Sequence, residues 1–169
     1  MLEKLHGIAR SKTYWLALIL LGIAQLAIAL VYQHVWDELP CVLCIHVRLW
    51  VTCSVLLASV ALLFRRHGLV IAGFHALNTV IMAGMFERSW QLLGTERGTI
   101  IAACDFDLGL PGWLALDKWF PAVFQAQTAC GYTPELLFGI TMAEGLVAIS
   151  GVLVIVSATL TLVSLLRRT

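Results

Sequence analysis

Charged side chains are scarce in this sequence of 169 residues. Only 12% of the residues are charged and 60% are hydrophobic, whereas about a quarter of a typical soluble domain is charged. This scarcity excludes a water-soluble globular domain. The near balance of 11 Lys and Arg against 10 Asp and Glu excludes a strongly basic nucleic-acid-binding protein. What is left is an integral protein of the lipid bilayer.

Proline is absent from the interiors of four long apolar runs, at about residues 13–33, 42–64, 69–93 and 142–166. A helix rises about 1.5 Å per residue and the hydrocarbon core is about 30 Å thick, so about 20 apolar residues span it. Uninterrupted runs of this length indicate helices rather than β-barrel strands. The sequence therefore predicts an all-α membrane protein, one domain over residues 1–169, with four transmembrane helices in a bundle.

Basic residues are distributed unevenly around these runs. Seven of the eleven lie in the N-terminus, the connection between the second and third runs, or the C-terminus: Lys4, Arg10, Lys12, Arg65, Arg66, Arg167 and Arg168. Because short cytoplasmic segments carry the excess of Lys and Arg, we expect both termini in the cytoplasm and loops 34–41 and 94–141 on the opposite side. The aromatic-rich segment 111–124 of the long loop predicts a short helix in the membrane interface, and Tyr14 and Trp15 fit an interfacial belt.

This topology places four of the five cysteines on the outer side, where disulfides persist in bacteria. Cys41 and Cys44 have the two-residue separation of redox-active dithiols. Four cysteines allow three pairings. A bond between Cys104 and Cys130 would close a loop of about 27 residues and contribute about 3 kcal/mol, enough for a structural role. Cys53 lies inside the second run, where we expect a small buried hydrophobic residue.

The pair Cys41 and Cys44 opens the second span directly after Pro40. The positive end of a helix dipole and its unpaired N–H groups lower the pKa of a cysteine there, and the thiolate is the reactive species. Arg48 lies one turn deeper on the face of Cys44, where its charge favours a thiolate or an anionic ligand. Two alternatives remain. In the first, Arg48 reaches the outer headgroups and the two cysteines only stabilise the start of the helix. In the second, His34 or His46 binds zinc together with the cysteines.

An ordered set of motifs resembles the DsbB family, the quinone-linked membrane oxidases that regenerate the periplasmic dithiol oxidase DsbA. The matching residues are Gln33-His34-Val35, Pro40-Cys41-Val42-Leu43-Cys44, Arg48, Cys104-Asp105-Phe106, Leu116-Asp117-Lys118-Trp119, Cys130 and Phe138-Gly139. They extend over most of the chain, in the order and topology of the family.

The resemblance implies an enzyme of the bacterial inner membrane with a defined electron route. A reduced DsbA-like partner attacks the disulfide of Cys104 and Cys130, with Cys104 forming the mixed disulfide. Cys130 exchanges with Cys41, and Cys44 then faces a ubiquinone or menaquinone of the membrane pool beside Arg48. No metal is implied. Arg88, near the outer end of the third span, is a further candidate quinone contact, and we expect no ion pair with Glu87 because adjacent helical residues point apart.

Three positions depart from the family pattern. Val47 stands where relatives commonly carry a polar residue. The segment 87–91 lacks the histidine that relatives often place beside the quinone. Ala143 and Gly145 replace a proline and a tryptophan that often open the last helix. The first two departures concern the lining of the quinone pocket, whereas the cysteine relay is intact.

Three other functions compete with this interpretation. In a structural or interaction protein with four spans, the outer disulfides would be inert and would only stabilise the fold. A quinone reductase similar to vitamin K epoxide reductase would use a comparable bundle, although that family carries its CxxC motif on the last helix. A paralogue with a dedicated partner in place of general DsbA is the third.

Overall fold

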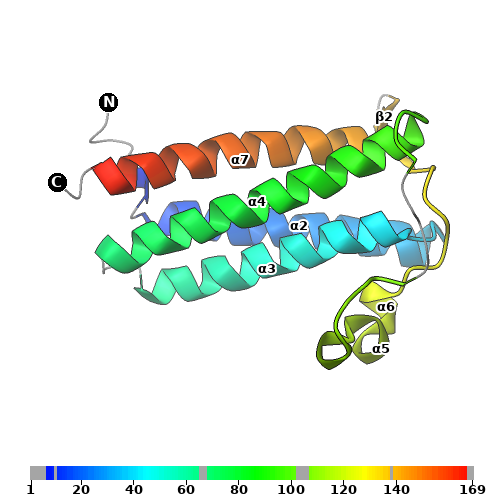
Figure 1. Ribbon diagram of the computed structural model, residues 1–169, viewed down its shortest axis with the longest axis horizontal. Helices are drawn as coiled ribbons and strands as arrows, with labels where there is room; N and C mark the ends of the chain where they lie inside the picture. Colours follow the sequence, from blue (N-terminus) through cyan, green and yellow to red (C-terminus); the bar gives the residue numbers. More distant parts are fainter. Residues whose placement is uncertain (1–6, 10, 65–67, 102–106, 138, 167–169) are drawn as a thin grey trace.

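Four long helices form the protein in the computed structural model, which describes residues 7–9, 11–64, 68–101, 107–137 and 139–166. They are α2 (Lys12–Val35), α3 (Val42–Phe64), α4 (Gly68–Glu96) and α7 (Met142–Leu166). α3 and α7 coincide with the expected ranges, while α2 and α4 extend beyond theirs by up to three residues at an end. Figure 1 shows the four helices side by side along the long axis. The prediction of an all-α four-helix membrane bundle is confirmed.

The helices pack in chain order, with α2 against α3, α3 against α4, and α4 against α7. Two apolar clusters fill the bundle, one of which contains Trp15, Ala58 and Ile71 and the other Val47 and Met82. Trp15 is fully buried, so its expected place in an interfacial aromatic belt is wrong. Its indole packs against neighbouring helices, where a large ring contributes more contact area than at the bundle surface.

Polar side chains inside the bundle join helices to one another. Asn78 of α4 donates to Ser157 Oγ of α7 at 2.9 Å and accepts from Ser54 Oγ of α3 at 3.4 Å. The hydroxyls of Thr79 and Thr161 lie 3.0 Å apart. In an apolar environment such groups must be satisfied within the protein, so these contacts fix how α3, α4 and α7 are aligned.

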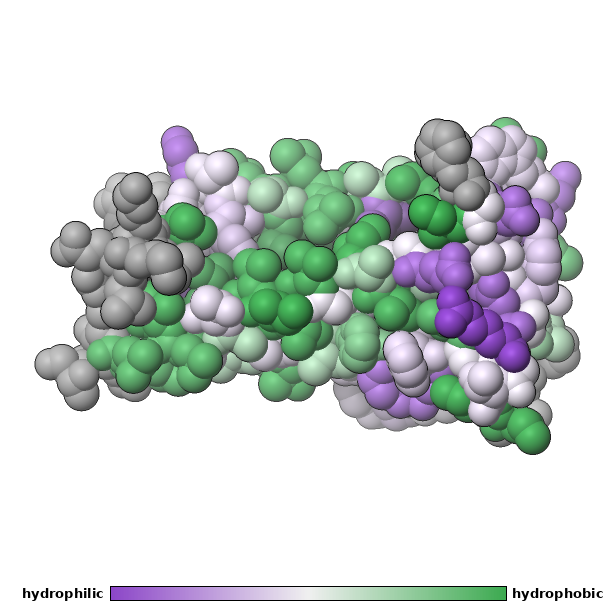
Figure 2. All heavy atoms as spheres, turned by 90° about the horizontal axis from the view of Figure 1, so that it is seen from above, coloured by the Kyte–Doolittle hydropathy of each residue, from purple (hydrophilic) through white to green (hydrophobic). Residues whose placement is uncertain are grey.

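The outer surface of the helices is apolar. Each of the four is long and hydrophobic enough to cross a membrane, and large exposed side chains such as Leu20, Leu63 and Ile155 lie on them. Figure 2 shows hydrophobic residues over the middle of the molecule and hydrophilic ones gathered toward the end that carries the loop after α4. This distribution is that of a multi-pass membrane protein.

The loop after α4 folds into short elements at that end of the bundle (Figure 1). They are the 3₁₀ turn η1 (Gly112–Leu114), α5 (Leu116–Trp119), α6 (Pro121–Phe124), and the antiparallel strands β1 (Glu135–Leu137) and β2 (Ile140–Thr141). The single short helix expected over 111–124 is therefore wrong. Phe120 has φ −133° because the following proline disfavours a helical conformation, and the break separates α5 from α6.

Candidate functional site

The two cysteines of the CxxC motif lie where α3 begins. Cys41 directly precedes α3 and is buried, whereas Cys44, in its first turn, is half-buried. Both are thiols, with their Sγ atoms 2.7 Å apart, and the backbone N–H of Cys44 donates to Cys41 Sγ at 3.3 Å. The start of a helix thus supplies the donor expected to stabilise a thiolate.

The pKa of the Cys41 thiol is lower than that of an ordinary cysteine. A hydrogen bond from the Cys44 thiol is the main cause of its lowered pKa, and backbone N–H groups at the helix start act in the same direction. Burial opposes them without reversing the result. Cys41 is therefore the sulfur that the first turn of α3 prepares for thiolate chemistry.

Cys130 lies next to this pair. It is disulfide-bonded and packs, with Cys44, against an apolar cluster that contains Cys41, Leu43 and Ala143. The structure thus brings three of the four expected catalytic cysteines together. Cys104, the fourth, lies outside the described residues, so its bond to Cys130 stays a prediction.

The chain leading to Cys130 runs beside the start of α3. The N–H of Gln127 donates to the carbonyl of Pro40 at 2.9 Å, and Thr128 forms an isolated parallel bridge with Cys41. Backbone hydrogen bonds therefore hold the residues before Cys130 against the CxxC motif.

Arg48 is buried one turn below Cys44, with 6% of its surface exposed. Nη1 donates to Gln33 Oε1 at 2.5 Å and to the carbonyl of Val123 at 2.9 Å, and Nη2 donates to the carbonyl of Ala29 at 3.2 Å. These acceptors come from α2 and α6. The guanidinium points into the protein, which rules out the alternative that Arg48 reaches the outer headgroups.

The two histidines of the zinc alternative contact loop carbonyls. His34 Nε2 donates to Ala122 O and His46 Nε2 to Leu108 O, each at 3.0 Å. Within the described part of the chain, His, Cys, Asp and Glu side chains form no group of three or more that could hold a metal ion. Both histidines thus tether the outer loop to α2 and α3.

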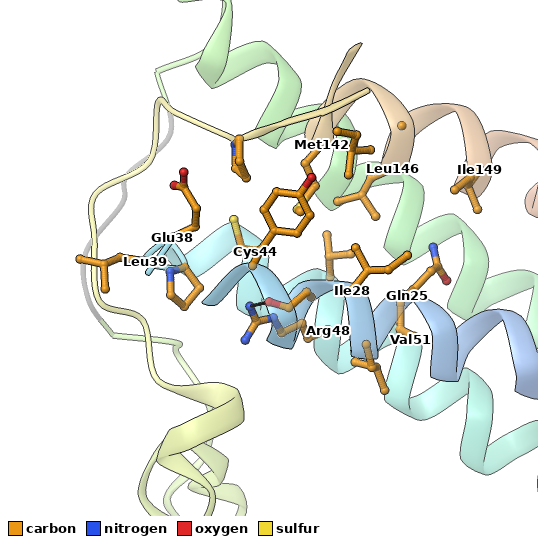
Figure 3. Close-up of a pocket in the computed structure, with 18 of the residues that line it drawn as sticks. Gln25, Ile28, Glu38, Leu39, Cys44, Arg48, Val51, Met142, Leu146 and Ile149 are labelled. Atoms are coloured by element: carbon orange, nitrogen blue, oxygen red, sulfur yellow. Dashed lines mark hydrogen bonds between the residues drawn. The ribbon is translucent and has the colours of Figure 1, made fainter. Parts of the chain in front are cut away.

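A cavity of about 130 Å³ opens beside Cys44 between α2, α3 and α7. Figure 3 shows Cys44 and Glu38 toward one end, Gln25, Val51 and Ile149 toward the other, and Arg48 between them. Most of the lining is apolar: Leu26, Ile28, Ala29, Leu39, Pro40, Val47, Val51, Pro134, Leu136, Met142, Leu146 and Ile149. Among the described residues the lining includes Cys44 but not Cys41, so the two sulfurs of the motif face different surroundings. Val47 lines the cavity as an apolar residue.

Sequence reasoning missed four polar residues of the cavity lining, namely Gln25, Tyr32, Glu38 and Tyr132. The Tyr132 hydroxyl donates to Glu38 Oε1 at 3.5 Å, and the negative charge of Glu38 raises the pKa of Tyr132. Gln25 Nε2 is buried and has no hydrogen-bond partner in the described part of the chain. A signal for Gln25 was present, because an amide in the middle of an apolar span usually faces the protein interior.

Arg88 lies on α4 and is not among the described residues that line the cavity. Its Nε contacts Glu87 Oε2 at 3.1 Å, and Nη1 donates to Gln91 Oε1 at 3.2 Å. The expectation that Arg88 and Glu87 do not pair is wrong, because both side chains are long enough to bend toward each other along the helix surface. Both are substantially exposed, so the pair contributes little to stability.

Comparison with known proteins places these features in context. The family model described as "Disulfide bond formation protein DsbB" matches residues 11–160. Disulfide bond formation protein B 2 of Pseudomonas aeruginosa is 34% identical over 136 residues, which cover 79% of this chain and 80% of the relative. Disulfide bond formation protein B of Pectobacterium atrosepticum is 32% identical over 163 residues, covering 88% and 90%. Its counterpart in Sodalis glossinidius is 30% identical over 156 residues, covering 89% and 86%.

Proposed function

The chain belongs to the DsbB family of disulfide bond formation proteins, and from this premise we propose that it is a dithiol:quinone oxidoreductase of the bacterial inner membrane. It reoxidises a DsbA-like thioredoxin-fold protein in the periplasm and passes the electrons to the quinone pool. One observation carries the proposal: Cys44 lines an apolar cavity with a buried arginine, while Cys41 packs beside the disulfide-bonded Cys130.

The different positions of Cys41 and Cys44 support a division of labour between them. Thiol–disulfide exchange needs a thiolate that can reach a disulfide sulfur. Cys41 lies within reach of Cys130 because both belong to one apolar cluster, and its lowered pKa makes it a good leaving thiolate when Cys104 displaces it. Cys44 faces the cavity instead. We therefore assign exchange with the outer pair to Cys41 and contact with the quinone to Cys44.

Each step of the proposed route conserves electrons and protons. A thiolate of the reduced partner attacks Cys104 of the outer disulfide and releases Cys130 as a thiolate. Cys130 attacks Cys41 of the oxidised inner pair and releases Cys44. The second thiol of the partner then displaces Cys104, which in turn displaces Cys41 from Cys130. The partner leaves as a disulfide, the outer disulfide is restored, and the inner pair holds two electrons and two protons.

The residues that line the cavity fit a quinone by their chemistry. Its walls are mainly aliphatic, which suits a ring with an isoprenoid tail, and Arg48 supplies a permanent positive charge beside an acceptor oxygen. A quinone held by Arg48 and Cys44 would supply the acceptor for the two electrons and two protons of the reduced Cys41–Cys44 pair. Arg48 is held by acceptors on α2 and α6, so its guanidinium is positioned before the ligand arrives.

The proposed orientation puts the cysteine-bearing end of the bundle in the periplasm and both chain termini in the cytoplasm. α2 begins and α7 ends at the end of the bundle opposite to α5 and α6 (Figure 1). Lys12, the one of the seven basic residues expected in the cytoplasm that the structure describes, begins α2 at that end.

Alkylation trapping tests this function against that of a structural protein with inert disulfides. Membranes are incubated with a reduced DsbA-like protein, with ubiquinone or without it, then quenched with a thiol reagent that adds mass. We expect reduced Cys41 and Cys44 to accumulate when quinone is absent and to be oxidised when it is added. If both cysteine pairs remain oxidised in the absence of quinone, the protein is not an electron carrier.

A further inference from the structure

Gln25 interrupts an apolar stretch of α2. Between Trp15 and Val31 it is the only Asn, Gln or charged residue. Its Nε2 atom is buried without a hydrogen-bond partner in the part of the chain that the structure describes. A buried amide donor without an acceptor lowers stability, and lipid offers none. A polar side chain that is unsatisfied at this depth therefore requires an explanation beyond packing.

The helical register connects Gln25 with the arginine of the cavity. Gln25, Ala29 and Gln33 follow one another at intervals of four residues and so lie along one face of α2. Ala29 and Gln33 both accept hydrogen bonds from Arg48. Gln25 continues this row about 6 Å deeper than Ala29, because four residues rise about 1.5 Å each.

The same cavity contains both polar groups. Gln25 and Arg48 line it together with Cys44, and Figure 3 shows Gln25 at the end away from Cys44, with Arg48 between. Val51 and Ile149, which lie with Gln25 toward this end of the cavity in Figure 3, are aliphatic. The cavity thus offers a ligand one charged donor near the reactive sulfur and one neutral amide about a helical turn deeper.

We propose that Gln25 binds the second oxygen of a para-quinone whose first oxygen lies beside Arg48 and Cys44. The inference rests on the proposed function and names a ligand contact within it. A para-quinone carries its two oxygens on opposite edges of one six-membered ring, so a cavity with two separate polar anchors suits it. The Gln25 amide offers a donor, Nε2, to a quinone oxygen and an acceptor, Oε1, to a quinol hydroxyl. It therefore pairs with the ligand in either redox state.

A purely structural role for Gln25 makes the opposite prediction about stability. Gln25 and Ser54 also line a second cavity of about 10 Å³, close to the smallest volume that holds one water molecule. If a water there satisfies the amide, replacing Gln25 with leucine destabilises the ligand-free protein. If the amide is unsatisfied until a ligand binds, the same replacement removes an unsatisfied donor and stabilises the ligand-free protein.

The test uses the full chain in lipid nanodiscs, with Cys44→Ser present throughout so that bound quinone is not reduced. Ubiquinone-1 with ¹³C at either ring carbonyl is the probe, and infrared difference spectra report each carbonyl separately. Gln25→Leu is compared with Ser54→Ala, which alters the small cavity and the hydrogen bond to Asn78 but not the lining of the larger cavity. We expect Gln25→Leu to shift one carbonyl band to higher frequency, weaken ubiquinone-1 binding about three- to tenfold and raise the unfolding temperature without ligand. Ser54→Ala leaves both carbonyl bands unchanged.

The outcomes separate this inference from the proposed function. If the Cys44→Ser protein binds ubiquinone-1 and Gln25→Leu leaves both carbonyl bands and the affinity unchanged, the Gln25 contact is overturned and the proposed function stands. A lower unfolding temperature in Gln25→Leu together with unchanged bands identifies the bridging water. If the protein binds no ubiquinone-1 at all, both the contact and the quinone-linked function are overturned.

Discussion

Arg48 of α3 donates from Nη1 to the side-chain amide oxygen of Gln33 on α2, at 2.5 Å. Both residues are buried, and the amide nitrogen of Gln33 in turn donates to the carbonyl of Ala122 at 3.3 Å. Gln33 therefore connects the arginine of the cavity with the loop that leads to Cys130. A charged group taken out of water needs such acceptors, because its desolvation is costly when it is left unpaired.

Replacing Gln33 with leucine removes one acceptor of Arg48 and the tether to Ala122. We expect the free energy of unfolding in detergent micelles to fall by about 1–3 kcal/mol, the cost of leaving a buried polar partner unsatisfied. Gln125→Leu, at an exposed position of the outer loop, is the matched control and should leave stability unchanged. Equal stability of Gln33→Leu and wild type would show that the Arg48–Gln33 contact does not support the fold.

The lowered pKa of Cys41 predicts a thiolate below the ordinary cysteine value of 9.0. Ultraviolet thiolate absorbance during a pH titration measures it, in a background where Cys53, Cys104 and Cys130 are alanine. Cys44→Ala removes the main hydrogen-bond donor, so the pKa of Cys41 should rise. Cys44→Ser keeps a hydroxyl donor and should restore part of the shift. An unchanged titration curve in Cys44→Ala would contradict the assigned cause.

The same shift has a consequence for stability. The folded-state pKa of Cys41 lies below its unfolded value. Cys41 therefore stabilises the folded, reduced protein, and this contribution is fully present above the unfolded pKa. The contribution is lost as pH falls through the folded pKa. Chemical unfolding of the reduced protein should therefore show stability increasing with pH between the two values, and this increase should disappear in Cys41→Ala.

The hydroxyl of Tyr132, which lies beside Glu38, is a second group whose titration can be measured. The charge of Glu38 is the main reason for the raised pKa of Tyr132. Glu38→Gln removes that charge, so we expect tyrosinate to form at lower pH than in the wild type. Difference absorbance at alkaline pH follows the transition, and Glu87→Gln on α4 is the control that should not change it. The prediction fails if the Tyr132 titration is the same with and without Glu38.

The hydrogen bond from Asn78 to Ser157 joins α4 to α7 inside the bundle. A double-mutant cycle of Asn78→Ala and Ser157→Ala should give a coupling energy of about 0.6 kcal/mol, with an upper limit near 1.7 kcal/mol for contacts of this kind in membrane proteins. Ser59, which donates to Val55 within its own helix, is the control partner. The effects of Asn78→Ala and Ser59→Ala should add. Additive effects of Asn78→Ala and Ser157→Ala would mean that the contact does not couple the helices.

The sequence was sufficient for the four helices because their apolar runs are long and end at basic or polar segments. The bounds of α3 and α7 follow from Pro40 before Cys41 and from the family motif that ends at Gly139. Trp15 was misplaced because a tryptophan near a span end is compatible with both a lipid interface and a helix contact. Only the packing of α2 on its neighbours decides between these.

The site was predictable where chemistry depends on local spacing. Cys44 and Arg48 share one helix, which Cys41 directly precedes, so the sequence predicts that Cys44 and Arg48 lie on one face. The contacts of Arg48 with Gln33 and Val123 join separate elements, and nothing local indicates them. Gln25 was overlooked for a similar reason, since its position in the cavity depends on how α2, α3 and α7 surround that space.

Anaerobic mixing of the fully reduced protein with ubiquinone-1 or a soluble menaquinone analogue tests the central claim most directly. Quinone absorbance and trapped thiols are followed together. We predict that one quinone is reduced per Cys41–Cys44 pair oxidised, that Cys44→Ser abolishes the reaction, and that Cys53→Ser, in the same helix, retains it. Quinone reduction by Cys44→Ser at the wild-type rate, or no reduction by the wild type with either quinone, would contradict the account.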